Sequence, residues 1–268
     1  FMAEGKTYYL ELTDPKLSFG SIPVTDLNSN ILFIPRDGDT AATQLSKFNS
    51  KNRTLNAIFR ETDLKFENND IVFNRKNLKT GMFASQMRND YADKGKDKQE
   101  KGLTHAIASD FTNPTKLNSL KFYDLKTLSD TVAYDYGFTI KNELTEVVSI
   151  KIFRIPWSEA VKSLDFLSLE NRKYPFLIWN YSAAEVSREV MDIEIPKGKL
   201  LAEPPKSVTL TCSAADYSLT YSTPAAGKIR AIREIRYKKD VVPAAEYEQF
   251  RDFFNKVAEA DSKQMGFK

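Results

Sequence analysis

The sequence predicts a mainly β protein with some α-helix: an antiparallel β-sandwich domain with a C-terminal packing helix, preceded by a small α+β segment. Three observations predict this fold class. Apolar and polar residues alternate with a period of two in most segments after residue 118, as they do in half-buried strands. Turn-forming residues separate these segments at the spacing of a β-sandwich. Of the 268 residues, 41% are hydrophobic and 12% aromatic, which is enough to bury a sizeable core.

The first quarter of the chain is predicted to hold short strands. Residues 7–12 and 31–34 are strand-like runs. Residues 56–61 and 70–74 are predicted to pair as a hairpin, because two consecutive asparagines favour a turn just before the second run.

Two helices are predicted next, over residues 81–94 and 97–109. β-Branched residues are sparse in this region, and Met82, Met87 and Tyr91 recur at helical spacing.

The period of two then returns and predicts a series of strands. They are expected at residues 118–125, 131–140, 147–153, 175–180, 184–195, 208–212, 217–222 and 228–238. Asn142 and Glu143 are predicted to form a hairpin turn between the second and third of these strands.

The C-terminal segment is predicted to be a helix. Pro243 suits the first turn of a helix. Tyr247, Phe250, Phe254 and Val257 follow at intervals that place them on one stripe. Such a helix is expected to pack on a sheet face or to cover an edge strand.

Charge and hydropathy exclude some classes of function. The chain has 39 basic and 36 acidic residues, a net charge of +3, so it lacks the strong positive field of a nucleic-acid-binding protein. It has no apolar run of the roughly 18 residues that a membrane span needs. Its first residues lack the pattern of a signal peptide, and their early strand pattern favours a fragment or a processed chain.

Reactive side chains are scarce. Cys212 and His105 are the sole cysteine and histidine, so no disulfide within the chain, soft-metal site or cofactor is expected. Strand register predicts that Cys212 packs as a small apolar residue, and His105 is predicted to lie on a helix surface. A Cys212–His105 dyad has no support in the sequence, although sequence distance alone leaves it open.

Three further groups of residues have a structural and a ligand-binding interpretation. The acidic residues Asp63, Glu67 and Asp70 match no calcium loop and are predicted to form a solvated rim. The aromatic residues around Trp179, and Trp157, are predicted to pack in the core, with a ligand platform as the alternative. The basic run is expected to be a solvated strand face that is neutralised by cross-strand acids such as Asp192 and Glu194. This run consists of Lys228, Arg230, Arg233, Arg236, Lys238 and Lys239.

Short motifs at both ends resemble a known family. Residues 7–13 (Thr-Tyr-Tyr-Leu-Glu-Leu-Thr) and 19–23 (Phe-Gly-Ser-Ile-Pro) resemble the end of a transglutaminase-like core in secreted bacterial proteins. There, an aromatic pair precedes Leu-Asp-x-Thr and a Gly-x-x-Pro turn follows. Residues 171–176, 193–198 and 242–251 are similar to the β-sandwich module of unknown function that follows this core. The resemblance covers most of the chain.

The resemblance implies three regions: tail strands of the core (1–45), an α+β connector with two helices (46–112) and a β-sandwich domain with a C-terminal helix (113–268). It also implies a Cys-His-Asp triad whose Cys and His would precede this sequence. The position of the third member is occupied by Glu11. A glutamate can orient an imidazole as an aspartate does, and a plain strand residue is the alternative interpretation of Glu11.

The resemblance and the missing nucleophile–base pair together predict a non-catalytic accessory or interaction module of a secreted transglutaminase- or protease-like protein. Its expected partners are an upstream transglutaminase-like core and peptides or glycans, and its expected location is periplasmic or secreted. No enzyme activity is expected of this chain alone. The rival predictions are a stand-alone hydrolase with a carboxylate-lined cleft between the two parts and a purely structural adaptor.

Overall fold

The computed structural model describes residues 2–26, 29–35, 38, 43–48, 55–162, 164–182, 184–202 and 205–268. It confirms a mainly β fold with a C-terminal packing helix. The α-helices are α1 (Met82–Tyr91), α2 (Lys96–Ala108) and α3 (Tyr247–Asp261).

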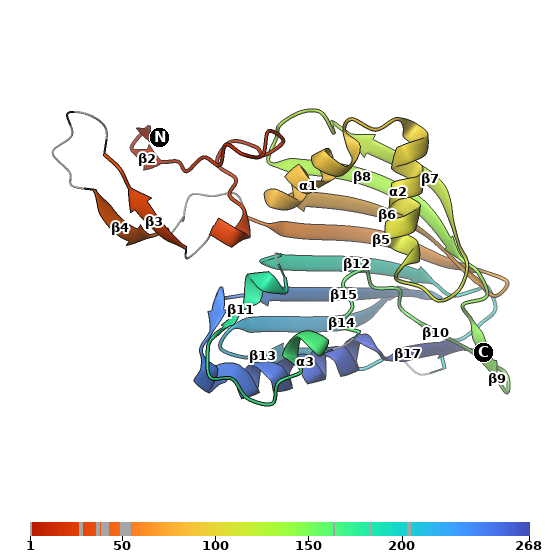
Figure 1. Ribbon diagram of the computed structural model, residues 1–268. Helices are drawn as coiled ribbons and strands as arrows, with labels where there is room; N and C mark the ends of the chain where they lie inside the picture. Colours follow the sequence, from red (N-terminus) through yellow and green to blue (C-terminus); the bar gives the residue numbers. More distant parts are fainter. Residues whose placement is uncertain are drawn as a thin grey trace.

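An eight-stranded sheet forms the body of the molecule (Figure 1). Its order is β13-β14-β15-β12-β5-β6-β8-β7. Neighbouring strands are antiparallel except β5 and β12, which run parallel. Its strands are β5 (Ala57–Glu67), β6 (Asp70–Thr80), β7 (Thr115–Tyr123), β8 (Thr131–Ile140), β12 (Val186–Glu194), β13 (Val208–Thr211), β14 (Ala215–Ala225) and β15 (Lys228–Tyr237).

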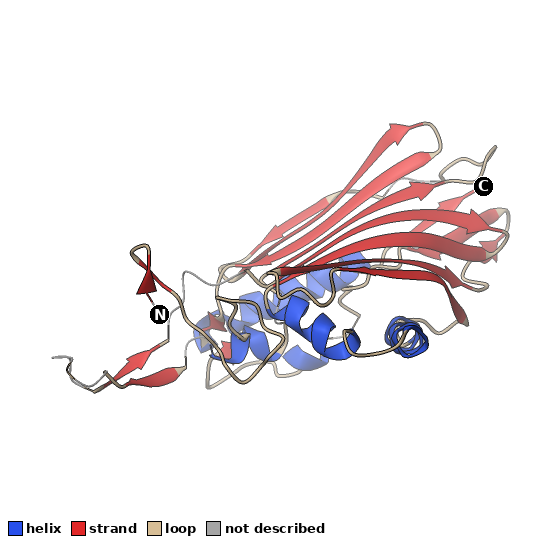
Figure 2. Ribbon diagram, turned by 90° about the horizontal axis from the view of Figure 1, so that it is seen from above, coloured by secondary structure: helices blue, strands red, loops and turns tan. Residues whose placement is uncertain are grey.

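The strands expected to stack as two layers of a sandwich lie in this one sheet. β5 and β6 lie between β12 and β8, so the sheet crosses the expected boundary at residue 112, and the division into domains stays a prediction. The three helices lie on one face of the sheet, and the other face is open (Figure 2). The period of two correctly marks a buried side on each strand, but it does not say whether a second sheet or helices cover that side.

Smaller sheets lie around the large one. They are β17-β10-β9, β11-β16, β3-β4 and β1-β2. Their strands are β1 (Met2–Ala3), β2 (Lys6–Thr7), β3 (Asn30–Phe33), β4 (Gln44–Lys47), β9 (Thr145–Val147), β10 (Ile150–Arg154), β11 (Phe176–Leu177), β16 (Val241–Val242) and β17 (Gln264–Phe267). Four short 3₁₀ helices, η1 (Val24–Asp26), η2 (Asp165–Leu167), η3 (Ile178–Asn180) and η4 (Ala244–Glu246), complete the described elements.

Local sequence signals predicted several elements correctly. The two predicted helices are α1 and α2, and the predicted hairpin is β5–β6 with longer strands. Three predictions were wrong. Residues 147–153 do not pair with β8, because β10 pairs with β9 and with the unpredicted C-terminal strand β17. Residues 175–180 do not form one strand: they form the short strand β11 and then η3. The N–H of Ile178, the first residue of η3, donates to the carbonyl oxygen of Asp240. Residues 8–12 form no strand beyond β2.

The helices supply the apolar cover of the sheet. The predicted stripe of α3 is buried, and Phe254 lies 6.3 Å from the ring of Tyr237 on β15. At the other end of the sheet, Tyr91 of α1 lies 5.1 Å from Phe122 of β7. Both contacts belong to one core cluster, so the two ends of the sheet share one core.

Gly81 fixes the start of α1. Its φ is +60°, a conformation that residues with a Cβ adopt at a cost. A Cβ on Gly81 would also collide with Oδ1 of Asn56, the atom that accepts the N–H of Met82. Asn56 is fully buried, so it has no room to move.

We therefore expect Gly81→Ala to lower the free energy of unfolding by about 2–4 kcal/mol, from backbone strain and the broken Asn56 contact. Urea unfolding measures this. Gly95→Ala is the matched control, because Gly95 precedes α2 with φ −66° and open space around it. Equal unfolding midpoints for the two variants would contradict the expected role of Gly81.

Candidate functional site

A row of charged residues lies on the buried face of the sheet. Arg60 of β5, Glu189 of β12 and Arg233 of β15 are direct neighbours across three strands. All three are buried, because each has the parity that points toward the helices. Charges in a protein interior are costly unless they are paired, so this row determines which groups must lie over it.

Each charge of the row has a partner. Arg233 donates to both carboxylate oxygens of Asp261 on α3, at 2.7 and 2.8 Å. Arg75 of β6 lies 2.7 Å from Glu189. Arg60 donates to Glu159 at 2.8 Å. A fourth cation on this face of the sheet, Lys79, takes part in none of these ion pairs. We call the six paired residues the buried charge network: Arg60, Arg75, Arg233, Glu159, Glu189 and Asp261. Five of the six are buried, and Glu159 is exposed. Three cations face three anions, so the network is neutral.

The network also holds the chain segment of residues 156–161 on the sheet. Arg75 donates to Pro156 O at 3.0 Å. The N–H of Ser158 donates to Glu189 at 3.1 Å, and the N–H of Val161 donates to Asp261 at 2.9 Å. Backbone groups of this irregular segment are thereby satisfied inside the protein.

A cavity of about 260 Å³ lies beside the network, between the sheet and the helices α1 and α2. Its wall on the sheet side is polar, and its wall on the helix side is mostly apolar. The lining residues are Arg60, Arg75, Asn77, Lys79, Gln86, Met87, Asp90, Tyr91, Leu103, Ala106, Ile107, Asp110, Phe111, Tyr134, Tyr136, Ser158 and Glu159. A concave site with a few convergent polar groups is the usual form of a ligand site.

Lys79 is the unusual residue of this cavity. Its Nζ lies 3.5 Å from the sulfur of Met87 and 5.9 Å from the ring centre of Tyr134, and none of the described ion pairs includes it. Burial, and then the neighbouring Arg60, lower the pKa of the Lys79 amine to about 8. A perturbed amine in a cavity marks a candidate functional site.

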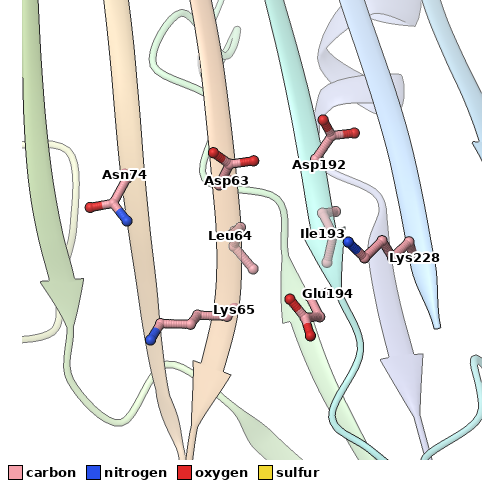
Figure 3. A pocket seen from close by; sticks show the side chains of 8 residues that line it. All are labelled: Asp63, Leu64, Lys65, Asn74, Asp192, Ile193, Glu194 and Lys228. Carbon is pink, nitrogen blue, oxygen red and sulfur yellow. The ribbon is translucent and has the colours of Figure 1, made fainter.

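The open face of the sheet carries a smaller hollow of about 110 Å³ (Figure 3). Asp63 and Asp192 stand opposite each other on β5 and β12. Arg230 binds Asp192 with two hydrogen bonds of 2.7 Å, and these bonds hold the pKa of Asp192 below its usual range. This contact confirms the predicted pairing of the basic run with Asp192, whereas neutralisation by Glu194 stays a prediction. Arg233 points to the buried side. The face is a solvated strand surface.

The predicted acidic rim is occupied by ion pairs. Asp70 binds Lys141 at 2.6 Å and Glu67 binds Lys65 at 2.7 Å. Within the described residues, no group of three or more His, Cys, Asp or Glu side chains is arranged to hold a metal ion.

The predicted aromatic core is confirmed only in part, and Trp179 is half-buried beside Ile22 and Phe48. Trp157 is buried, and Phe176 packs 5.6 Å from Phe250 of α3. Tyr181 stacks on Phe166 at 3.3 Å, but Tyr174 and Tyr181 are both exposed. Phe176 and Tyr181 also contact aromatic rings of α3.

A larger hollow, of about 840 Å³, lies between β10, α3 and the residues that follow α2. Its rim carries the Lys162–Asp110 ion pair at 3.0 Å and the Asn113–Glu143 hydrogen bond at 2.8 Å. These four residues are thus already engaged with one another.

Glu11 lies in a turn rather than in a strand. Its two carboxylate oxygens accept the N–H groups of Thr13 at 2.7 Å and Asp14 at 2.9 Å. These bonds, with that from the hydroxyl of Thr13 as the largest effect, hold the pKa of Glu11 below its usual range. Its role as a triad acid stays a prediction.

Cys212 and His105 do not form a dyad. Cys212 follows β13 at one edge of the sheet, and His105 is exposed on α2, which packs near β7 at the opposite edge. Seven strand spacings of about 4.8 Å separate these edges, on the order of 30 Å. The thiol and the imidazole therefore cannot act together within one chain.

The N-terminal arm, defined as the described part of residues 2–48, stands beside the sheet (Figure 1). Within it, only Ile22 and Phe48 form a buried apolar cluster. Leu12 is 85% exposed, Ile34 71% and Leu45 72%. We call the exposed large apolar residues of the arm the apolar arm surface: Leu10, Leu12, Phe19, Leu32, Ile34 and Leu45.

Sequence reasoning missed the buried charge network and Lys79. One signal was available for part of it: the parity of Arg233 already placed it opposite the other basic residues of its strand. Glu159 and Asp261 gave no such signal, because they come from a connecting segment and from a helix end far along the chain.

A family model described as a domain of unknown function with a solved structure, DUF3858, matches residues 149–267. Among solved structures, the chain is similar to one from Parabacteroides distasonis that is described as a candidate protease. The identity is 18%, the TM-score is 0.36, and the match covers 44% of this chain and 23% of that one. The chain thus spans less than a quarter of that protein. No curated protein matches.

None of the helices in the described part of the chain has the length and apolar character needed to cross a membrane.

Removing one partner of the buried pair should be far more costly than removing one partner of the exposed pair. We expect Asp261→Asn to lower the free energy of unfolding by about 3–5 kcal/mol, because Arg233 would stay buried without its counter-charge. Asp192→Asn, which breaks the half-exposed pair with Arg230, should cost about 1 kcal/mol or less. Urea unfolding of both variants measures the difference, and equal costs would show that the network does not hold α3.

The amine of Lys79 should give stability a distinct pH dependence. Its pKa in the folded state is about 8, below the ordinary 10.5, so between these values the unfolded chain binds more protons. Stability should therefore rise as pH increases from about 8 to 10.5, and below pH 8 the whole cost of burying the charge is present.

Lys79→Met should remove this rise of roughly 1–3 kcal/mol between pH 8 and 10.5. Urea unfolding across that range measures it as the difference from the wild-type chain. Lys76→Met is the control, because Lys76 lies three residues earlier on the same strand and is exposed. This variant should retain the rise in stability between pH 8 and 10.5. A wild-type profile parallel to that of Lys79→Met would show that Lys79 titrates normally.

Proposed function

We propose that this chain is a non-catalytic accessory or interaction module of a secreted transglutaminase- or protease-like protein. The module supports the catalytic core through its N-terminal arm and presents a surface to peptides or glycans. The observation that carries this proposal is the apolar arm surface.

The arm is fixed to the body by polar contacts with α1 and by a small apolar cluster, in which Ile22 and Phe48 pack with Met82 of α1 and Trp179 of η3. Ser85 and Asn89 of α1 donate to the carboxylate of Asp14. Arg88, which is fully buried, donates to the carbonyl oxygens of Lys16 and of Thr131 at 3.2 and 3.1 Å. The arm therefore has a defined place on α1 while the residues of the apolar arm surface stay exposed.

An exposed surface of this kind is expected to have a partner. Burying a leucine or isoleucine side chain contributes about 1.5–3 kcal/mol each, and contiguous exposed apolar residues mark interaction sites. The arm also contains β3 and β4 as a two-stranded sheet, and isolated hairpins are marginally stable alone. The motifs that resemble the end of a transglutaminase-like core lie in this same arm, which supports such a core as the partner.

The chain's own reactive groups support a non-catalytic role. Its thiol and imidazole lie at opposite edges of the sheet. The alternative is a stand-alone hydrolase that uses carboxylates of the cavity below α1 and α2. Asp90 and Glu159 line that cavity, but Glu159 is already bound to Arg60.

The proposal predicts that charging the arm abolishes docking. A double variant, Leu12→Lys with Ile34→Lys, should bind a separately expressed transglutaminase-like core of the parent at least about 10-fold more weakly than wild type, because it loses apolar burial. Titration calorimetry measures the affinity. Leu128→Lys with Leu200→Lys is the matched control, since both residues are exposed outside the arm.

Unchanged affinity of the arm variant, or equal loss in the control, would refute docking through the arm. Hydrolysis or cross-linking of peptide substrates by the purified chain would refute the non-catalytic role. If that activity then disappeared in Asp90→Asn or Glu159→Gln, the hydrolase alternative would replace it.

A further inference from the structure

We infer that the cavity between the sheet and the helices α1 and α2 is a binding site for a small carboxylate-bearing molecule with one flat apolar group. This inference goes beyond the docking role and is independent of it, because the cavity and the apolar arm surface share no residue.

The two walls of the cavity have opposite character. The helices contribute Met87, Tyr91 and Leu103, which are largely buried and together make an apolar wall. The sheet contributes Arg60 and Lys79 as cations. A ligand with an apolar body and an anionic end matches both walls at once. The carboxylates of the cavity nearest to the amine are Glu159, which is bound to Arg60, and Asp90.

Two neighbouring cations of the cavity, Lys79 and Arg60, have incomplete hydrogen bonding or charge pairing. Every member of the buried charge network has an oppositely charged partner. The amine of Lys79 instead donates to a weak acceptor, Sδ of Met87. Nη1 of Arg60 is a buried donor that has no hydrogen-bond acceptor in the described part of the chain. Buried polar atoms are rarely left unsatisfied, so an acceptor is missing beside Arg60 and Lys79. Oδ1 of Asn77, also buried and unpaired, needs a donor instead.

The volume limits the size of the ligand. At about 260 Å³, the cavity lies below the range of roughly 300–1,000 Å³ that holds drug-sized molecules. One aromatic ring with a short carboxylate arm is the size that this space suits. Such a group is found both in free aryl acids and at the C-terminus of a peptide that ends in phenylalanine.

Binding of an anion should keep Lys79 protonated. Titratable and charged groups that face this amine come from β5, α1, β8 and the segment after β10; they are Arg60, Asp90, Tyr91, Tyr134 and Glu159. The pKa of Tyr91 is raised to about 12 by burial, so it stays neutral where the amine titrates. Affinity for the anion should therefore fall as pH rises above 8.

Calorimetric titration of the whole chain with phenylacetate tests the inference, with phenylacetamide as the uncharged control. We expect saturable binding of phenylacetate and at least about 10-fold weaker binding of phenylacetamide, the cost of one lost charge-assisted contact. Lys79→Met should reduce phenylacetate binding by a similar factor and abolish the fall above pH 8. Lys76→Met, on the open face, should bind as wild type does.

Ala106→Trp gives a second route that removes no charge. Ala106 is exposed and lines the cavity, so an indole there should block entry without disturbing the core. Circular dichroism confirms that each variant is folded. The peptide Gly-Gly-Phe and its C-terminal amide then distinguish the source of the carboxylate. Tighter binding of the peptide acid identifies a peptide C-terminus, and tighter binding of phenylacetate identifies a free aryl acid.

Three results would overturn the inference. They are no saturable binding of either acid, equal binding of phenylacetate and phenylacetamide, and unchanged binding in folded Lys79→Met and Ala106→Trp. The first removes the site, the second removes the carboxylate requirement, and the third places the ligand elsewhere on the protein.

Discussion

The architecture depends on neutralising charges that the sheet turns inward. Arg60, Glu189 and Arg233 lie side by side on the buried face, where water cannot solvate them. Their partners Glu159 and Asp261 come from a connecting segment and from the end of α3. A sheet with this row is stable only when both elements lie over it, because an unpaired buried charge costs several kcal/mol. The charge network thus fixes the positions of elements that the apolar core alone would leave free to slide.

The buried charge network also stabilises the place where two groups of strands meet in the sheet. Two antiparallel groups of strands meet at the parallel pair β5 and β12, whose residues are more than 120 positions apart in the sequence. Such long-range pairing pays a large entropy of loop closure. The Arg75–Glu189 pair spans this junction from β6 to β12, and Arg60 lies between them. A buried ion pair therefore crosses the place where the two groups of strands meet.

How far the sequence predicted this structure depends on the range of each interaction. The helices α1 and α2 and the β5–β6 hairpin are encoded by neighbouring residues, and their prediction was correct. The face of Arg233 also followed from parity. The single sheet, the parallel β5–β12 pair and the β10–β17 pair involve segments far apart, and a period of two carries no information about partners. Lys79 was missed for the same reason, because its environment is made by α1, β5 and β8 together.

The charges of the buried charge network have a structural role, whereas the charge of Lys79 serves another purpose. All six network residues have partners within hydrogen-bonding distance, and their fixed geometry holds α3 and residues 156–161. Lys79 lies on the same face and beside the same arginine, yet it contributes no comparable bond to the fold, and the folded state bears the cost of its burial. A cost of this kind persists when a residue acts on something outside the chain. The apolar arm surface is the corresponding case for apolar groups, since its leucines remain in water while the rest of the chain buries its core.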